Sequence, residues 1–137
     1  RKGRSAALAE LAVKTEEALA EGRQVILFPE GTRRPPGAEP AYKYGIVHLY
    51  DRLKAPVLPV ALNSGVYWPR RKFLRRPGTI VVEVLDPILP GLSKEAFFAE
   101  LQGRIEDASN RLLAEGRGEL VQEGIPQPAD ERPARGA

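Results

Sequence analysis

"VILFPEGTRRPPG", residues 25–37, joins an apolar run to a charged turn, and the interpretation of the chain depends on it. Branched and aromatic side chains in a short run are typical of a strand buried on both faces. The run leads directly into residues 29–33, where proline and glycine bend the backbone beside a carboxylate and a cation. Two interpretations stay open from these residues alone: a charged strand exit with a surface ion pair, or the floor of an anion-binding site.

The anion-site interpretation gives each residue of the turn a chemical role. Gly31 has no Cβ, so a ligand can approach the backbone closely there. Arg33 and Arg34 can each donate two charge-assisted hydrogen bonds to a phosphate. Glu30 can accept hydrogen bonds from a hydroxylated ligand or orient Arg33.

Composition excludes several kinds of chemistry. The 137 residues suit one domain, and no cysteine is present for disulfides, thiolate catalysis or cysteine metal sites. His48 is the only histidine, which excludes multi-histidine metal sites, so we predict no metal and no resident cofactor. The apolar runs are far shorter than the roughly 20 residues that span a bilayer. We expect a reducing, cytosolic setting.

The chain contains no methionine and begins at Arg1. Since its first segment has helical spacing and no sorting signature, we expect the chain to be the C-terminal part of a longer protein.

Positive charge is concentrated in the middle of the chain. Residues 23–76 contain eleven Lys and Arg residues against three acidic residues, whereas residues 77–137 contain six against eleven. The middle of the chain is therefore expected to attract an anionic partner.

The pattern predicts an α/β fold, a small mixed sheet flanked by helices. Predicted helices begin at Ser5, cover residues 45–53, and begin again after Ser93, with an apolar stripe that ends at Leu113. Predicted strands cover residues 24–28, 56–62 and 78–85, of which the second contains Pro59, typical of an edge or a bulge. We assign residues 1–115 to the folded domain and residues 116–137, which are rich in Gly, Pro and charge, to a disordered tail.

A second basic segment, "VYWPRRKFLRRPG" at residues 66–78, interleaves cations with aromatic side chains. This composition fits an anionic membrane interface, where rings settle at the boundary and cations meet headgroups. Nucleic-acid binding, with bases stacked on the rings, and a solvated loop with its rings in the core are the alternatives. The candidate membrane-surface residues are Trp68, Arg70, Arg71, Lys72, Phe73, Arg75 and Arg76.

Three further polar residues are candidates for the same anion site. Lys43 adds a cation if the loop before it folds back over Arg33, although an exposed lysine is the simpler expectation. Asn63 and Ser64 follow the second strand, where we expect a turn with Gly65.

Two motifs resemble conserved blocks of the glycerolipid acyltransferases. "FPEGTR" at residues 28–33 is similar to the third block of that family, and "VLPVAL" at residues 57–62 is similar to the fourth. The distance between them is also similar to that in bacterial members, and the resemblance covers residues 1–115. The resemblance implies a glycerol-phosphate acyltransferase-like fold. Within the family, the chain resembles most the branch that acylates 1-acyl-glycerol-3-phosphate.

The resemblance implies a division of roles within the site. Residues matching Glu30, Gly31, Thr32 and Arg33 bind the phosphate-bearing acceptor, and the strand of Pro59 lines the acyl-donor side. The implied reaction transfers an acyl group from acyl-coenzyme A or acyl carrier protein to a lysophospholipid hydroxyl. The implied location is peripheral, on the cytoplasmic face of the membrane.

The chain departs from the family at its catalytic block, a His-x4-Asp motif that precedes the third block. His48 lies after the third block, and Asp51 follows it by three residues. We therefore expect His48 to face solvent or cap a helix, assign no catalytic residue to this chain, and predict that it is inactive alone. The alternative function is a non-catalytic module that binds anions or a membrane surface.

Overall fold

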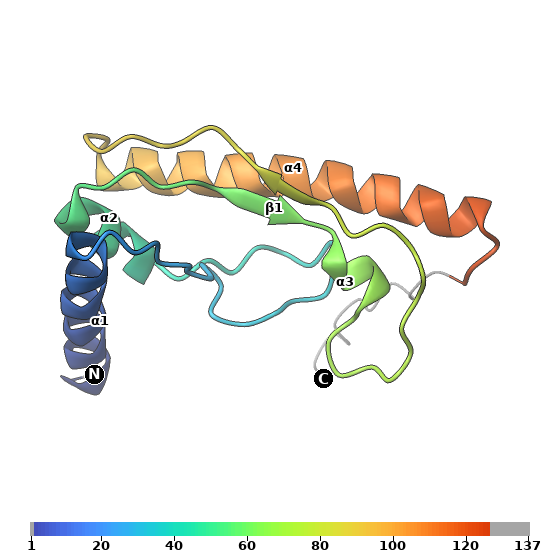
Figure 1. The fold of residues 1–137 in the computed structure, drawn as a ribbon, viewed down its shortest axis with the longest axis horizontal. Helices are drawn as coiled ribbons and strands as arrows, with labels where there is room; N and C mark the ends of the chain where they lie inside the picture. The colour runs from blue at the N-terminus through green and yellow to red at the C-terminus, as the bar shows by residue number, and fades with distance from the viewer. Residues whose placement is uncertain (1, 127–137) are drawn as a thin grey trace, which may run out of the picture.

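The computed structural model describes residues 2–126, which form four helices and a two-stranded sheet (Figure 1). Figure 1 shows the longest helix, α4, running along the molecule, with α1 standing across one end of it. In chain order the elements are α1 (Lys2–Ala20), α2 (Gly45–Leu53), β1 (Val60–Leu62), α3 (Ser64–Tyr67), β2 (Val82–Val84) and α4 (Lys94–Gln122). None of the described helices is both long and apolar enough to cross a membrane.

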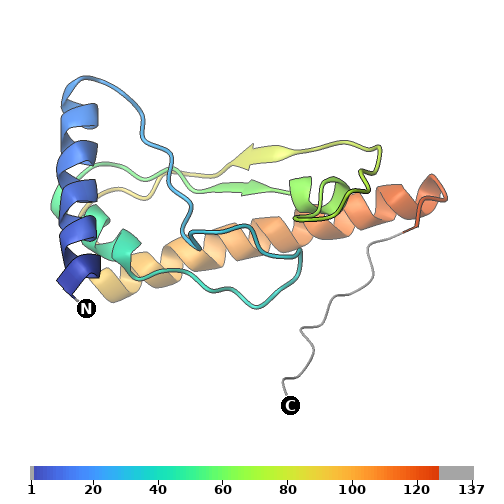
Figure 2. The ribbon, with the colours of Figure 1, turned by 90° about the horizontal axis from the view of Figure 1, so that it is seen from below.

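The sheet is antiparallel, so the prediction of a mixed sheet is wrong. Val60 pairs with Val84 and Leu62 with Val82. Figure 2 shows the two strands running side by side along α4, with α3 at the end away from α1. An antiparallel pair needs no helical crossover, and the chain between the strands is the α3 turn and the basic loop.

Only one face of this sheet is covered. Ala61 is buried against Ala108 and Leu112 of α4. The neighbours of Ala61 along β1, Val60 and Leu62, point to the opposite face and are exposed, as expected from the alternation of side chains along a strand. An apolar face of the sheet is therefore open to solvent in the described chain.

Residues 24–28 were predicted to form a buried strand, and this prediction is wrong. No strand forms there, and Ile26 and Phe28 are 81% and 76% exposed. A strand requires a neighbour that completes its hydrogen bonds, and no described strand pairs with this segment. The branched apolar composition of the segment does not indicate whether such a neighbouring strand is present.

The helix predicted over residues 45–53 is confirmed as α2, and Ser93 caps α4 as expected. The Ser93 side chain accepts a hydrogen bond from the Ala96 N–H at 3.1 Å. Where α2 crosses the start of α4, the Tyr50 and Phe97 rings stack with centroids 3.8 Å apart. This contact forms the centre of the main core cluster.

The prediction of a disordered tail from Gly116 is wrong for residues 116–122, which continue α4. Leu120 is fully buried and packs with Val66 and Tyr67 of α3. Burial of this side chain favours helix despite the glycines before it. Residues 127–137 of the predicted tail lie outside the described residues.

Candidate functional site

The segment "FPEGTR" forms a tight turn with an open backbone. The Gly31 N–H donates to the Phe28 carbonyl at 2.9 Å, and Gly31 has φ of +69°. This left-handed conformation favours glycine. A Cβ placed at Gly31 would meet no atom within 4 Å, so a ligand can approach the backbone here.

Glu30 closes the loop that follows this turn. Its Oε1 accepts a hydrogen bond from the Ala41 N–H at 2.9 Å. Beside it, the Lys43 N–H donates to the Pro29 carbonyl at 2.7 Å. The loop therefore folds back to its own start, which brings the backbone of Lys43 next to the turn.

Arg34, rather than Arg33, is the cation that Glu30 orients. The Arg34 Nε lies 3.6 Å from Glu30 Oε1, and its Nη2 donates to the Glu39 carbonyl at 3.0 Å. Our expectation that Glu30 could orient Arg33 is wrong in this structure. One carboxylate thus offsets the charge of Arg34 within the loop.

The Arg33 guanidinium has no partner within the described part of the chain. The Arg33 side chain is exposed and has no hydrogen bond or ion pair with any residue from 2 to 126. Its carbonyl accepts a hydrogen bond from Arg70 Nη1 at 3.2 Å, which fixes the backbone of the turn. All five guanidinium N–H donors of Arg33 can therefore serve an anion.

Pro59 lies in the core, directly before β1. It is fully buried, and its carbonyl accepts a hydrogen bond from the Leu85 N–H at 2.9 Å. The residues on either side, Leu58 and Val60, are exposed. Leu58 and Val60, and not Pro59 itself, can therefore contact a ligand through their side chains. This follows from the alternation of side chains along a strand, and the motif alone did not indicate it.

The basic loop between α3 and β2 presents an aromatic and cationic tip. Phe73 is 101% exposed, and Arg75 covers the half-exposed Trp68 ring at 4.7 Å. Arg71 has φ of +58°, a conformation that non-glycine residues seldom adopt. The loop therefore holds its most apolar tip residue away from the core.

Arg75 and Arg76 of this loop donate hydrogen bonds to backbone carbonyls. Arg75 donates to the carbonyls of Lys72 and Phe73, and Arg76 donates to the Pro126 carbonyl at 2.8 Å. These two arginines thereby shape the loop and attach it to the end of the described chain.

A polar network that we did not predict anchors the basic loop to α4. Tyr67 Oη and the Thr79 N–H both donate to the Glu119 carboxylate. Asn63 links the end of β1 to the start of β2, because its Oδ1 accepts a hydrogen bond from the Val81 N–H at 2.8 Å. Burial and the Glu119 contact raise the pKa of Tyr67 to about 12, and the hydrogen bond from Tyr67 lowers the pKa of Glu119. Such partners, far apart in sequence, leave no local signal.

His48 faces solvent on α2, as expected, and does not form a catalytic pair. The edge of its ring lies against Tyr44, with centroids 5.9 Å apart. Asp51 pairs instead with Lys54 at 3.1 Å and Lys94 at 3.4 Å, and the hydrogen bond from Lys54 is the main cause of its lowered pKa.

Two hollows on the described surface lie away from the 28–34 turn. One lies between β2 and α4 and is lined by both acidic and basic side chains, among them Glu83 and Arg111. The other lies beside residues 87–92. Neither includes the 28–34 turn, which is an exposed surface site. Within residues 2–126, no cluster of three or more histidine and acidic side chains is arranged to hold a metal ion.

Comparison with known proteins agrees with the resemblance seen in the motifs. Residues 1–63 match the family described as Acyltransferase. The chain is 40% identical over 111 residues to the 1-acyl-sn-glycerol-3-phosphate acyltransferase of Pseudomonas aeruginosa, covering 80% of this chain and 42% of that protein. It is 33% identical over 86 residues to the human 1-acyl-sn-glycerol-3-phosphate acyltransferase beta, covering 61% and 31%.

The mouse 1-acyl-sn-glycerol-3-phosphate acyltransferase alpha is 32% identical over 72 residues, covering 51% of this chain and 25% of that protein. The chain thus spans less than half the length of these relatives. No solved structure matches it significantly.

Proposed function

This chain belongs to the acyltransferase family, and from that premise we propose that it supplies the acceptor-binding part of a 1-acyl-glycerol-3-phosphate acyltransferase. The proposed reaction transfers an acyl group from a thioester of coenzyme A or acyl carrier protein to the free hydroxyl of lysophosphatidate. The hydroxyl oxygen attacks the thioester carbonyl, and the thiol leaves. The observation that carries the proposal is the unpaired guanidinium of Arg33 beside the open Gly31 turn.

In this proposal the turn recognises the phosphate rather than the acyl chain. Arg33 donates paired hydrogen bonds to phosphate oxygens, a geometry that suits a guanidinium better than an ammonium group. Gly31 and Thr32 let the phosphate reach the backbone. Glu30 contributes indirectly, since it closes the loop and offsets the charge of Arg34.

We propose that Pro59 acts on the donor side through the strand it begins. Its fixed φ and buried ring position the start of β1. The exposed neighbours Leu58 and Val60 then offer apolar surface for an acyl chain.

The test is phosphate-ester binding by the 137-residue chain. Titrating it with glycerol 3-phosphate, followed by amide chemical shifts, gives the dissociation constant of the wild type and of Arg33→Gln. We expect Arg33→Gln to bind about tenfold to a hundredfold more weakly, because it loses hydrogen bonds between two charged groups.

Arg23→Gln is the matched control. Arg23 is an exposed arginine that pairs with Glu21, and its substitution removes the same charge outside the proposed site. Equal affinities for the wild type and Arg33→Gln would refute the proposed acceptor site. An equal loss of affinity for glycerol 3-phosphate in Arg33→Gln and Arg23→Gln would show that net charge alone attracts the anion.

We also propose that the chain works peripherally on an anionic membrane surface, at the cytoplasmic face. The full exposure of Phe73 beside exposed arginines supports this proposal. Each cation near an anionic leaflet contributes about 1 kcal/mol to binding. Co-sedimentation of the chain with phosphatidylcholine vesicles, with and without phosphatidylglycerol, measures this membrane binding.

We expect Phe73→Ser and Arg71→Gln each to reduce binding to the anionic vesicles. Val121→Ser removes an apolar side chain that is 61% exposed on α4 and serves as the control. If Phe73→Ser and Arg71→Gln sediment like the wild type, the loop is a solvated basic loop and not a membrane contact.

A further inference from the structure

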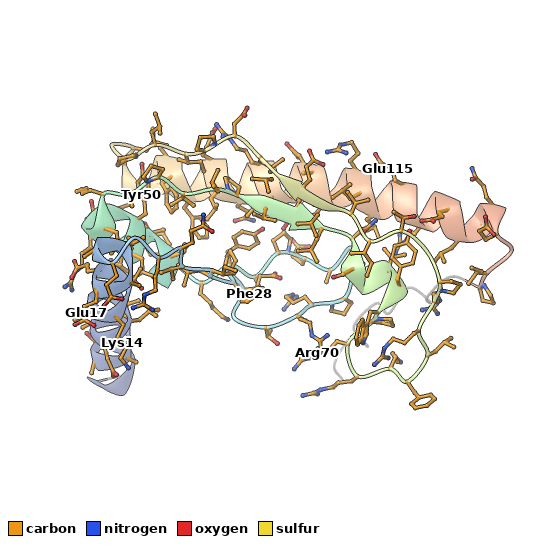
Figure 3. All side chains as sticks on the ribbon, viewed as in Figure 1. Lys14, Glu17, Phe28, Tyr50, Arg70 and Glu115 are labelled. Atoms are coloured by element: carbon orange, nitrogen blue, oxygen red, sulfur yellow. The ribbon has the colours of Figure 1, made fainter. Side chains whose placement is uncertain are left out.

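The 30–41 loop and the basic loop, far apart in sequence, meet at the candidate site. Arg70 Nη1 donates to the Arg33 carbonyl at 3.2 Å, and Figure 3 shows Arg70 next to the loop that follows Pro29. A second contact lies close by, since a Cβ at Gly65 would come within 2.8 Å of Pro36 Cγ. Gly65 belongs to α3, so the 30–41 loop touches both the basic loop and the helix that precedes it.

Two of the arginines at this junction have no carboxylate partner among the described residues. Arg34 has Glu30 as a partner, at 3.6 Å. Neither Arg33 nor Arg70 forms an ion pair with a carboxylate of residues 2–126. Two arginines at one junction, neither paired with a carboxylate of the described residues, favour a doubly charged anion at that place.

Arg70 also has hydrogen-bonding capacity to spare. A guanidinium has five N–H donors, and the contact with the Arg33 carbonyl uses one of them. The remaining donors can engage a phosphate oxygen while that contact persists. The contact itself is then a means of holding the guanidinium beside the turn.

The chain on both sides of Arg70 is fixed, which limits the entropy lost on binding. The Arg76 N–H donates to the Tyr67 carbonyl at 2.9 Å and closes the base of the loop. Behind it, Gly78 has φ of +150°, and a Cβ there would lie 2.0 Å from Tyr67 Cε1. The buried Tyr67 ring therefore sets where the basic loop leaves the core.

We propose that Arg70 is a second cation of the acceptor site and shares one phosphate monoester dianion with Arg33. This inference rests on the proposed function and adds to it a residue from a different loop. Arg70 belongs to the same loop as Phe73, so the shared phosphate lies beside the surface proposed to meet the membrane. The ligand is then the headgroup of a lipid that stays close to the bilayer.

Titration of the 137-residue chain separates binding by Arg70 from support of the turn. Arg70→Gln removes the charge but keeps an amide that can donate to the Arg33 carbonyl. Arg70→Ala removes both. We expect both variants to bind glycerol 3-phosphate about tenfold or more weakly than the wild type, because a hydrogen bond between two charged groups is lost.

The free-state amide shifts of residues 30–41 test the supporting role by itself. We expect them to be unchanged in Arg70→Gln, and Arg23→Gln to bind like the wild type. If Arg33→Gln weakens binding and Arg70→Gln does not, the inference about Arg70 is overturned while the proposed function stands. If neither weakens binding, both are overturned.

Two further ligands identify the source of the phosphate. Inorganic phosphate and a short-chain lysophosphatidate are titrated into the same variants. A similar fold-loss for both in Arg70→Gln, with tighter binding of the lysophosphatidate by the wild type, supports a lipid headgroup. Equal affinity of the wild type for the two ligands would overturn the assignment to a lipid.

Discussion

Glu30 shows how the role of one residue depends on contacts that its motif does not contain. Its type and position predicted a ligand-binding or arginine-orienting carboxylate. The structure places its oxygen on the Ala41 N–H, eleven residues along the chain, and beside Arg34. This return of the loop involves no local pattern, so the sequence indicated the carboxylate but not its partner.

Glu30→Ala is expected to lower the free energy of unfolding by about 1 kcal/mol, because the Ala41 N–H loses its acceptor. Glu30→Gln keeps an oxygen at the same place and should stay within about 0.5 kcal/mol of the wild type. Urea unfolding followed by circular dichroism measures both. Equal stability of the two variants would mean that the hydrogen bond contributes nothing.

His48 and Ser93 were easier to predict, because their environments are set by neighbours within one helix. Ser93 caps α4 through the N–H three residues ahead, and His48 lies on the exposed face of α2. Pro59 was harder, because its surroundings include residues distant in sequence, such as Leu85, whose N–H donates to the Pro59 carbonyl. Local chemistry was therefore predictable from sequence, and burial between elements was not.

Among the elements, those whose periodicity matches a buried face were predicted well. The helix over residues 45–53 and the start of α4 agree with the structure. The prediction of a strand at residues 24–28 was wrong because a strand needs a partner strand. The composition of this segment shows only that it is apolar. The predicted end of α4 was wrong because Gly116 and Gly118 have weak helix propensity. Tertiary packing overrides this propensity and continues the helix.

Leu120→Ala tests whether packing extends α4 past these glycines. The side chain is fully buried against Val66 and Tyr67, so we expect a loss of about 2–4 kcal/mol in the free energy of unfolding. Val121→Ala, at the adjacent exposed position, should change it by less than about 0.5 kcal/mol. Chemical denaturation of the three proteins gives the comparison. If Leu120→Ala is no more costly than Val121→Ala, the last turns of α4 are not held by α3.

At the scale of the whole molecule, Phe28 at the start of the open turn lies near the middle, and Arg70 of the basic loop lies further from α1 and contacts the turn through the Arg33 carbonyl (Figure 3). The acidic residues of the C-terminal half are carried mainly by α4, where Glu100 and Glu115 pair with arginines. The charge asymmetry of the sequence predicted this separation. What it could not predict was the contact between the 30–41 loop and the basic loop, which joins residues 37 positions apart in the chain.

The open apolar face of the sheet gives the last prediction. Val82 and Val84 are each 62% exposed, and they lie opposite Leu62 and Val60. Contiguous apolar surface of this kind binds hydrophobic dyes and promotes association. Replacing both valines with threonine keeps the branched shape that strands favour while adding a hydroxyl that can stay hydrated.

We therefore expect Val82→Thr with Val84→Thr to lower anilinonaphthalene sulfonate fluorescence and self-association, with little change in stability. Val13→Thr, on the exposed surface of α1, is the control for a change in overall apolar surface. Dye titration and sedimentation velocity measure the outcome. A wild-type chain that binds no dye, or a double variant that binds as much as the wild type, would show that this face is covered in solution.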